Sequence, residues 1–244
     1  MMTDEIPLRL NAFLARAGYG GRREATRLIA AGRVQVNGRL ETNALAEIDP
    51  NRAHVRVDGK LIKRLWPLTY LMLNKPAGAL TATRDQHRRR TVYDLLGRFR
   101  NVVQAVGRLD YDSEGLLLFT NDGDMAHTLT SPKSQAPKTY RVKIKGHISG
   151  KAMQKLRHGV DIGGYFTAPA KVKSQSRLKA NQWLRITLTE GKYRQVKRML
   201  AAVDHDVLRL IRTDFGPLSL GELPQGKFRH LEDWEVRRLR ALMK

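Results

Sequence analysis

One short segment places acidic residues directly before an apolar run, as in a site at the edge of a core. Residues 106–123 read VGRLDYDSEGLLLFTNDG, with Asp110, Asp112 and Glu114 ahead of the apolar residues 116–119. A continuous apolar run bounded by turn residues is typical of a central strand buried on both faces. The segment therefore predicts a carboxylate at the mouth of the core. Such a group can attack an electrophile, take a proton or stabilise positive charge.

Metal and cofactor chemistry find no support in the sequence. The acidic segment imitates the opening of a calcium loop, but its twelfth position is Asn121, where a bidentate Glu is needed. The seven histidines form neither an HExxH pattern nor a close pair, and the chain has no cysteine. A phosphate-binding loop and a dinucleotide fingerprint are also missing. We therefore expect an enzyme that works without metal or cofactor.

The charge of the chain indicates a polyanionic partner. Lys and Arg number 45 against 23 Asp and Glu, which gives a formal net charge of +22. Nucleic acid is the commonest partner of so basic a surface, and we favour it over an anionic membrane. The cations fall in clusters rather than evenly: Arg22, Arg23 and Arg27, then Arg84, Arg88, Arg89 and Arg90.

Length and hydropathy set the domain number and the compartment that we expect. A chain of 244 residues exceeds a typical domain of ~100 to 200 residues, so two unequal domains are predicted. No stretch approaches the ~20 apolar residues of a membrane span. The first ten residues include Asp4 and Glu5 and lack the apolar run of a signal peptide. We expect a cytoplasmic protein without membrane contact, and we assume a monomer.

Small elements are predicted at the amino end. Apolar residues recur at helical spacing over residues 10–17 and again over residues 25–29. Alternating valines then lead into Asn37-Gly38 and, further on, into Asp58-Gly59, which are strong hairpin signals. Two short helices and small strands thus form a compact basic unit.

A larger domain follows a linker at residues 63–68. Its strands are predicted at 70–73 and 116–119, and alternating patterns over 140–145 and 184–189 indicate two strands with one buried face each. The predicted helices include one capped by Ser149, one marked by Val196, Met199, Leu200 and Val203, and a last one marked by Trp234, Leu239 and Leu242. Because strands and helices do not alternate regularly, we predict an α+β fold with a mixed sheet.

The amino-terminal unit resembles the small RNA-binding domain shared with ribosomal protein S-four, the alpha-L motif. The resemblance lies in GGRREATRLIAAGRVQVNG, residues 20–38. At about 100° per residue, Arg23 and Arg27 project from the side opposite the buried stripe. Relatives usually carry Ser before the paired arginines, whereas this chain has Gly21, a weaker helix cap. The resemblance implies that Arg22, Arg23 and Arg27 contact RNA phosphates; a solvated helix face is the alternative.

The larger domain resembles the pseudouridine synthases, in the branch of the small-subunit and large-subunit ribosomal RNA enzymes. The segment GRLDYDSEGLLLFTNDG is similar to the catalytic motif of that family. LNKPAG before it, and KTY and EGKYRQVKRM after it, match three further motifs in the same order. The resemblance implies the pseudouridine synthase fold, a small α/β RNA-binding domain at 1–64 and a largely antiparallel catalytic domain at 69–244.

The resemblance also implies roles for individual residues. Asp110 corresponds to the catalytic aspartate, Tyr140 to the tyrosine that contacts the target base, and Lys197 to the basic residue that pairs with the aspartate. Periodicity adds that Lys197 lies at the edge of its helix's apolar stripe, whereas Arg194 and Arg198 point away from it. Lys197 would keep Asp110 ionised by favouring its charged form.

Other cations are candidates for RNA contact. Arg108 could bind a phosphate beside the extruded nucleotide, or pair with Asp112 or Glu114. Arg88 and Arg89 are expected in a basic loop against the RNA backbone, although a disordered surface loop is equally allowed. Lys75 and Pro76 are expected to be structural.

Together these expectations describe an isomerase that converts uridine to pseudouridine in ribosomal RNA, preferentially of the large subunit. The target base must leave the helix stack to be reached. The alternatives are an enzyme for small-subunit RNA and a ribosome assembly factor that binds RNA without chemistry. A pure binder has no need of an acid that repels phosphate within a basic cleft, which favours the enzyme.

Overall fold

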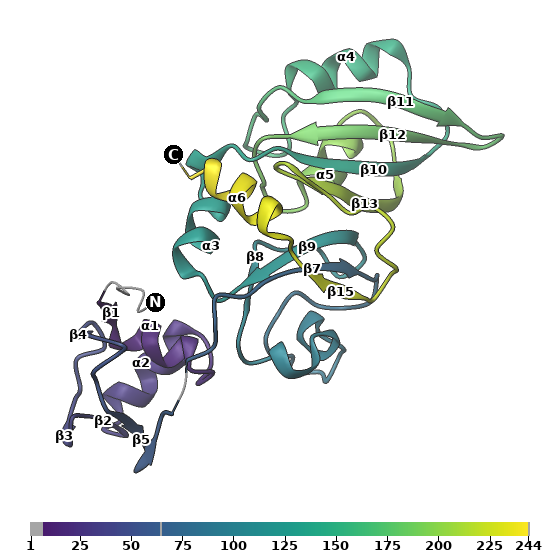
Figure 1. Cartoon of the computed structure of the whole chain (residues 1–244). Coiled ribbons are helices and arrows are strands. Elements are labelled where there is room, and N and C mark those ends of the chain that lie inside the picture. Colours follow the sequence, from purple (N-terminus) through teal and green to yellow (C-terminus); the bar gives the residue numbers. More distant parts are fainter. Residues whose placement is uncertain (1–6, 64, 244) are drawn as a thin grey trace. The chain divides into compact units, whose positions relative to one another are not determined.

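The computed structural model describes residues 7–63 and 65–243 (Figure 1). Two parts of the earlier predictions lie outside these ranges. They are Asp4 and Glu5, which argued against a signal peptide, and residue 64 of the expected linker. The chain divides into two compact units. The first holds the residues up to Thr69 with 97–104 and 120–123, and the second holds 70–96, 105–119 and the chain from Asp124 onward.

The first unit contains the two predicted helices and a small sheet. Helix α1 is Leu10–Arg16 and α2 is Arg22–Ala30. A four-stranded sheet has the order β3 (Arg39–Leu40), β2 (Val34–Val36), β5 (Val55–Val57), β6 (Lys60–Leu61), and β1 (Leu8–Arg9) pairs with β4 (Glu47–Ile48). Asn37 and Asp58 both have positive φ, at 50° and 49°, as hairpin turns of this kind require. Both predicted hairpins are thus confirmed.

Segments from later in the chain complete the first unit. The amide of Thr69 donates to Asn121 Oδ1 at 2.7 Å, and the Trp66 ring lies 6.0 Å from that of Phe99 in the 3-10 helix η2 (Gly97–Phe99). The expected linker at 63–68 therefore packs within a unit rather than standing apart, as far as its residues are described.

The second unit is built on a nine-stranded sheet. Its order is β11 (Lys171–Arg177), β12 (Asn181–Leu188), β10 (Lys138–Lys145), β13 (Val207–Phe215), β9 (Glu114–Thr120), β7 (Tyr70–Lys75) and β15 (Phe228–His230). Strand β14 (Leu218–Ser219) pairs with β13, and β8 (Gln104–Val106) pairs with β9. The pair β13/β9 is parallel, while β10 is antiparallel to both its neighbours. The predicted mixed, largely antiparallel sheet is confirmed.

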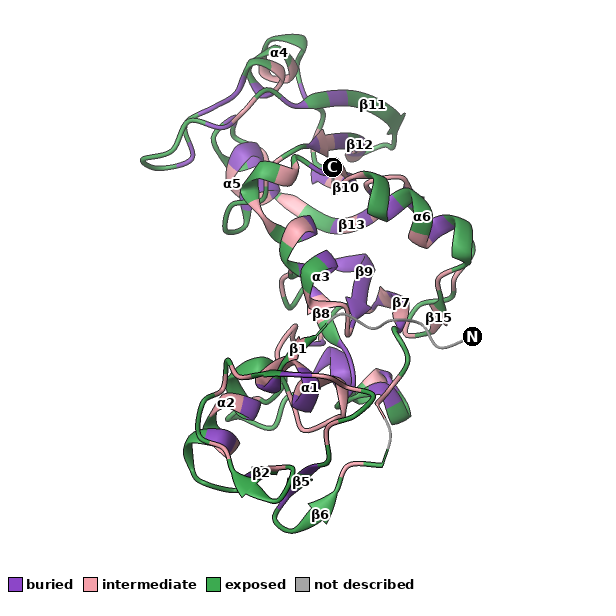
Figure 2. Cartoon of the chain, turned by 60° about the vertical axis from the view of Figure 1, so that its left-hand side comes forward, coloured by how far each residue is buried: buried purple, intermediate pink, exposed green. Residues whose placement is uncertain are grey.

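Helices cover this sheet in two groups. Helices α4 (Gly150–His158) and α5 (Gln195–Ala201) pack on β10 and β12 through Leu156, Met199 and Leu200. Helices α3 (Gly123–Thr130) and α6 (Asp233–Ala241) pack on β7 and β9 through Leu129 and Leu239. Two 3-10 helices, η1 (Val92–Leu95) and η3 (Pro132–Ser134), lie in connections. All seven residues of β9 are buried, as predicted for a central strand (Figure 2).

A short parallel seam joins the two halves of the sheet. Strand β13 meets β9 through two register pairs only, Ile211 with Glu114 and Arg212 with Gly115. Gly115 has φ +101°, and a Cβ placed there would lie 2.2 Å from the carbonyl oxygen of Arg212. The backbones can approach this closely only because residue 115 has no side chain.

The carboxyl-terminal helix differs from its prediction in what it buries. Trp234 was expected in the apolar stripe, but it is 48 % exposed, while Glu235 is 2 % exposed. Arg229 donates to both carboxylate oxygens of Glu235 at 2.6 and 2.7 Å. A bidentate pair of this kind makes burial of the acid tolerable, which periodicity cannot reveal. Within the described residues, no helix is long and apolar enough to cross a membrane.

Candidate active site

Asp110 is half-buried and lines a cavity in the second unit. The cavity has a volume of about 230 Å³ and is lined by segments that are distant in sequence: the loop before β9, the end of α3 with the start of η3, strands β10 and β13, and the segment that leads into α5. Asp110, Arg108 and Tyr140 all line it, as the sequence analysis expected of residues that share a site. Lys197 is not among the lining residues.

The loop that carries Asp110 is held by a segment that follows β7. The hydroxyl of Thr81 donates to the carbonyl oxygen of Leu109 at 2.8 Å. The amide of Gly78 donates to the Tyr111 carbonyl at 2.8 Å. Within the loop, the Ser113 amide donates to the Asp110 carbonyl at 3.1 Å, closing a turn. These bonds fix the backbone on both sides of the carboxylate.

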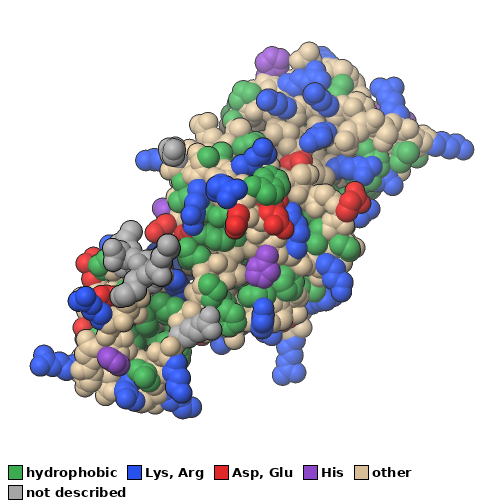
Figure 3. Space-filling view, viewed as in Figure 1, with side chains coloured by type: hydrophobic (Ala, Val, Ile, Leu, Met, Phe, Trp, Pro, Cys, Tyr) green, Lys and Arg blue, Asp and Glu red, His purple; other side chains and the backbone are tan. Residues whose placement is uncertain are grey.

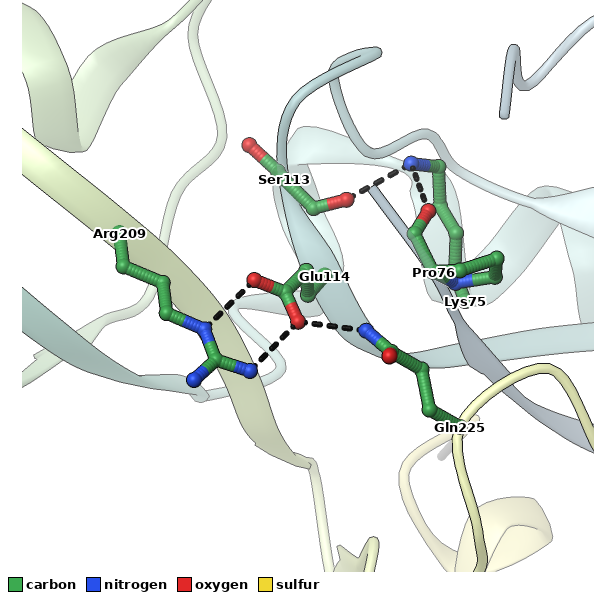
Figure 4. A network of polar contacts seen from close by, with 6 residues as sticks. All are labelled: Lys75, Pro76, Ser113, Glu114, Arg209 and Gln225. Carbon is green, nitrogen blue, oxygen red and sulfur yellow. Dashed lines mark hydrogen bonds and ion pairs between the residues drawn. The ribbon is translucent and has the colours of Figure 1, made fainter. Parts of the chain in front are cut away.

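Lys75 secures the same loop from inside the core. Its side chain is fully buried, and its ammonium donates to the carbonyl oxygens of Ser113 at 2.7 Å, Pro76 at 3.0 Å and Tyr111 at 3.3 Å. Figure 4 shows the bonds to Ser113 and Pro76. Burial lowers the pKa of Lys75 to about 8, although the charges of Asp112 and Asp110 act in the opposite direction. Lys75 therefore has a structural role, as expected: its ammonium holds the backbone of the loop that carries Asp110.

Lys197 pairs with a different acid from the one expected. Its ammonium donates to Asp112 Oδ2 at 2.5 Å. Burial acts to raise the pKa of Asp112, but the hydrogen bond and the charge of Lys197 outweigh it, and the pKa lies below its ordinary value. Lys197 stands on α5 and Asp112 is two residues beyond Asp110, where the turn places its carboxylate toward the helix. The direct pairing of Lys197 with Asp110 is therefore not seen.

Glu114 is engaged in a clamp across the seam of the sheet. Arg209 of β13 donates to its two oxygens at 2.7 and 2.8 Å, and Gln225 donates at 2.6 Å (Figure 4). Glu114 is 6 % exposed, so these three bonds compensate a buried charge. Asp112 pairs with Lys197 and Glu114 with Arg209, and neither of these two acids forms an ion pair with Arg108. Arg108 is exposed and lines the cavity.

Tyr140 stands beside two cations, Lys138 and Arg212, for which the sequence predicted no role. Its register partner on β13 is Arg212, and Lys138 lies two residues away on the same face of β10. The Lys138 ammonium and the Arg212 guanidinium lie 5.5 and 5.4 Å from the ring centre of Phe215. Burial, and then the charge of Arg212, lower the pKa of Lys138. All four side chains line the cavity.

The segment that leads into α5 forms another wall. Glu190 accepts hydrogen bonds from Tyr165 Oη at 2.6 Å, from the Ala168 amide at 3.0 Å and from Gln195 Nε2 at 2.5 Å. Gln195 Oε1 in turn accepts from the Lys192 amide at 2.9 Å. These bonds order the turn over residues 190–195 before the helix begins.

Arg194 corrects the helical interpretation of this segment. It was expected to point away from the cleft as part of the helix, but it lines the cavity. The helix begins one residue later, at Gln195, and Arg194 itself has φ 49° and ψ 34°. A residue in the left-handed region lies outside the helical periodicity, so its direction cannot be taken from a helical wheel. Arg198, inside the helix, donates to the carbonyl oxygens of Ile162 and Gly163.

The basic loop at 84–90 is ordered by one acid. Arg89 donates to Asp85 Oδ1 at 2.8 Å and Oδ2 at 3.1 Å, and the bonds from Arg89 hold the pKa of Asp85 well below its usual range. The Arg89 guanidinium lies 6.0 Å from the ring centre of Tyr111, next to Asp110. Arg88 is exposed, with φ 54°. Contact of this loop with the RNA backbone stays a prediction.

The amino-terminal arginines occupy an exposed helix face in the first unit. Arg22, Arg23 and Arg27 are all exposed on α2, whereas Ala25 and Ile29 are fully buried. The helix begins after Gly21 without a side-chain cap, as the sequence predicted. In neither unit do the described residues include a cluster of three or more His, Cys, Asp or Glu arranged to hold a metal ion.

Comparison with known proteins bears on both units. Residues 69–202 match the family model described as RNA pseudouridylate synthase, and residues 8–49 match that of the S4 domain. The chain is 42 % identical to an uncharacterized RNA pseudouridine synthase of Bacillus subtilis, over 94 % of this chain and 97 % of that one. It is 39 % identical to the ribosomal large subunit pseudouridine synthase B of the same organism, over 96 % of both chains.

A solved structure gives the same result for the fold. The crystal structure of a pseudouridylate synthase superposes with a TM-score of 0.67 at 30 % identity, and the match covers 95 % of this chain and 99 % of that one. The similarity therefore extends over both units rather than over the sheet alone.

Proposed function

Because the chain belongs to the RNA pseudouridylate synthase family, we propose that it isomerises uridine to pseudouridine in ribosomal RNA of the large subunit, with Asp110 as its essential carboxylate. The observation that carries the proposal is that Asp110, in the loop before β9, and Tyr140, on β10, line one cavity. The cavity is small, about 230 Å³, as suits one nucleoside rather than a folded RNA element.

The reaction needs few groups beyond a carboxylate and a way to hold the base. The bond from ribose C1′ to uracil N1 breaks, the base turns, and a bond forms between C1′ and C5. One proton leaves C5 and one is gained at N1, so all atoms of the substrate remain. Asp110 can attack the sugar or base, take the C5 proton or stabilise positive charge on the ribose. In each case its carboxylate must face an extruded nucleotide.

The backbone bonds around Asp110 supply the rigidity that such a step requires. Thr81 and Lys75 hold the carbonyls on both sides of the aspartate, and Lys75 does so from a fully buried position. A reactive group held by a rigid loop loses little orientational freedom when substrate binds. Lys197 contributes indirectly in this proposal: it fixes Asp112 and thereby the outer side of the same loop.

Cationic surfaces in both units support RNA as the partner. In the first unit the exposed arginines of α2 form one such surface, and we assign the domain at 1–64 to RNA binding. In the second, Figure 3 shows Lys and Arg side chains gathered over strands β10 to β12. Arg141 lies directly opposite Arg185, which lies opposite Lys173. Like charges in register repel one another. Asp214 pairs with Arg185 at 3.2 Å, and a polyanion bound over this surface would reduce the remaining repulsion.

The choice of large-subunit RNA rests on relatives. A relative named ribosomal large subunit pseudouridine synthase B aligns over nearly the whole of both chains. This favours the large-subunit transcript over the small-subunit one as substrate.

The test is pseudouridine formation by the purified protein. We expect product in a large-subunit RNA transcript with the wild type, none with Asp110→Asn, and nearly equal RNA affinity for the two proteins. Product in the small-subunit transcript alone would show that small-subunit RNA is the substrate. Binding by the wild type without any product would leave an RNA-binding assembly factor instead of an enzyme, and activity of Asp110→Asn would remove the aspartate from the chemistry.

A further inference from the structure

Two buried polar atoms in the described part of the chain lack a hydrogen-bond partner, and both belong to residues that line the cavity. They are the hydroxyl oxygen of Ser113 and Nη2 of Arg212. Ser113 is 1 % exposed and Arg212 is 2 % exposed. A buried polar atom without a partner costs free energy, so its occurrence at a functional cavity indicates a ligand that completes it.

The Arg212 side chain is already fixed at its other end. Its Nε donates to the Leu116 carbonyl oxygen at 2.7 Å, across the seam between β13 and β9. The Phe215 ring packs against the guanidinium. The free Nη2 is therefore a preorganised donor rather than the end of a mobile chain.

The Ser113 hydroxyl is equally constrained by the loop. The backbone of Ser113 donates to the Asp110 carbonyl and accepts from Lys75, which fixes the residue on both sides. In Figure 4 its hydroxyl end points away from the Lys75 ammonium. Ser113 lies three residues from Asp110, and both residues line the cavity.

The depth of these atoms identifies which part of a nucleotide they meet. A nucleotide within an RNA chain keeps its phosphates at the cavity mouth, because the backbone continues on both sides, and only the extruded base can go deeper. The rim offers exposed cations for phosphate, among them Arg108 and Arg194. Arg212 and Ser113, which are almost fully buried, are placed for the base.

We propose that Arg212 and Ser113 bind the extruded uracil, Arg212 Nη2 donating to a carbonyl oxygen of the base and the Ser113 hydroxyl pairing with a neighbouring edge atom. The inference rests on the proposed function and adds substrate-binding residues to it. Uracil presents two carbonyl oxygens and one N–H on its edge. Arginine can only donate, whereas a hydroxyl can donate or accept, so the pair is complementary to that edge.

The same contact has a use in the reaction. When the bond from C1′ to N1 breaks, its electron pair stays with the base, and the negative charge spreads to the two carbonyl oxygens. A buried guanidinium that already donates to one of them stabilises this charge more than it stabilises the neutral base. Lys138, beside Arg212 over the Phe215 ring, adds a second positive charge on the same side.

Ser113→Ala separates binding of substrate from support of the fold. In the free protein the hydroxyl has no partner among the described residues, so its removal should leave the unfolding midpoint unchanged or slightly higher. The single-turnover rate on saturating RNA should nevertheless fall by about tenfold, the equivalent of one hydrogen bond. A structural serine would show the opposite pattern, a lower midpoint with an unchanged rate.

Arg212→Met tests the donor, with Arg237→Met as its control. Arg237 is exposed on α6 and does not line the cavity. At saturating RNA we expect Arg212→Met to lower the single-turnover rate by roughly 10²- to 10³-fold, the range found for loss of one preorganised donor. The control should stay within twofold of the wild type. Loss of the fold in Arg212→Met would show in its circular dichroism. In that case the inference is tested by Ser113→Ala and by the wild-type protein with RNA that carries sulfur in place of a uracil oxygen.

Sulfur analogues locate the contact on the base. RNA that carries 2-thiouridine or 4-thiouridine at the modified position presents a weaker acceptor at one carbonyl. The wild type should lose rate on one of the two, and Arg212→Met should show no further loss on that analogue. If the wild type forms pseudouridine but tolerates both analogues and both substitutions within twofold, this inference is wrong while the proposed function stands. If the wild type forms none, the proposed function itself fails.

Discussion

Replacement of Gly115 by alanine should open the seam between the two halves of the catalytic sheet. A Cβ at this position would lie 2.2 Å from the Arg212 carbonyl oxygen and 2.8 Å from its amide nitrogen. Both are backbone atoms, so no side-chain rotation can relieve the overlap. The two register pairs that join β13 to β9 must therefore separate.

The magnitude follows from a comparison with a second glycine. Gly146 also has positive φ, +72°, but a Cβ there would meet nothing within 4 Å. Gly146→Ala should therefore cost only the backbone term, ~1–2 kcal/mol. Gly115→Ala adds the displaced strand and its hydrogen bonds at ~0.5–1.5 kcal/mol each, for a total of ~3–5 kcal/mol.

Thermal unfolding followed by circular dichroism measures the difference. At ~2–4 °C per kcal/mol for a chain of this size, Gly115→Ala should lower Tm by roughly 6–20 °C and Gly146→Ala by roughly 2–8 °C. Gly115→Ala should also lose activity at temperatures where it remains folded, because Asp110 and Tyr140 stand on opposite sides of the seam. Equal Tm values for the two variants would refute the importance of the close approach at the seam.

Three further predictions concern charged residues. Asp112→Asn should reduce the rate less than about tenfold, because the pair with Lys197 is 60 % exposed on the aspartate side and such pairs contribute ~0–1 kcal/mol; a loss as complete as that of Asp110→Asn would make Asp112 the essential acid. Lys75 has a folded pKa of about 8, below its unfolded value of 10.5, so the unfolded chain binds the extra proton between these pH values. The stability of the wild type relative to Lys75→Met, from urea unfolding, should therefore rise as pH increases from 8 to 10.5, and a fall over this range would contradict the assignment. Glutamine in place of all three α2 arginines should make the slope of log affinity against log salt concentration less steep by ~2–3, because each phosphate contact that is lost no longer releases counterions. An unchanged slope would remove Arg22, Arg23 and Arg27 from the RNA interface.

Strands with a consistent pattern could be predicted from the sequence. The continuous apolar run of β9 and the alternating patterns of β10 and β12 match the structure. The strand β13, VLRLIRTDF, was not predicted, because Arg209 and Arg212 interrupt its apolar residues and hide the alternation. Both arginines find partners on β9, Glu114 and the Leu116 carbonyl, and only the tertiary fold brings these together.

The candidate site divides in the same way. Asp110, Tyr140 and Arg108 could be proposed from motifs, and they line one cavity. Lys197 was predicted to pair with Asp110 but pairs with Asp112. The two acids are two residues apart, and the conformation of the turn that carries them decides which one faces the lysine. Arg212 and Ser113 gave no signal, because a missing hydrogen bond is a property of the folded chain. The direction of the Arg194 side chain was predicted wrongly because α5 begins at Gln195, one residue after it.

We propose that the enzyme isomerises uridine in ribosomal RNA with the carboxylate of Asp110. The most direct test of this role is a map of pseudouridines in ribosomal RNA from cells that lack the gene, complemented either with the wild type or with Asp110→Asn. We expect at least one large-subunit pseudouridine to disappear with the gene, to return with the wild type and to stay absent with Asp110→Asn. The account would be contradicted if the map did not change, or if Asp110→Asn restored the lost pseudouridine.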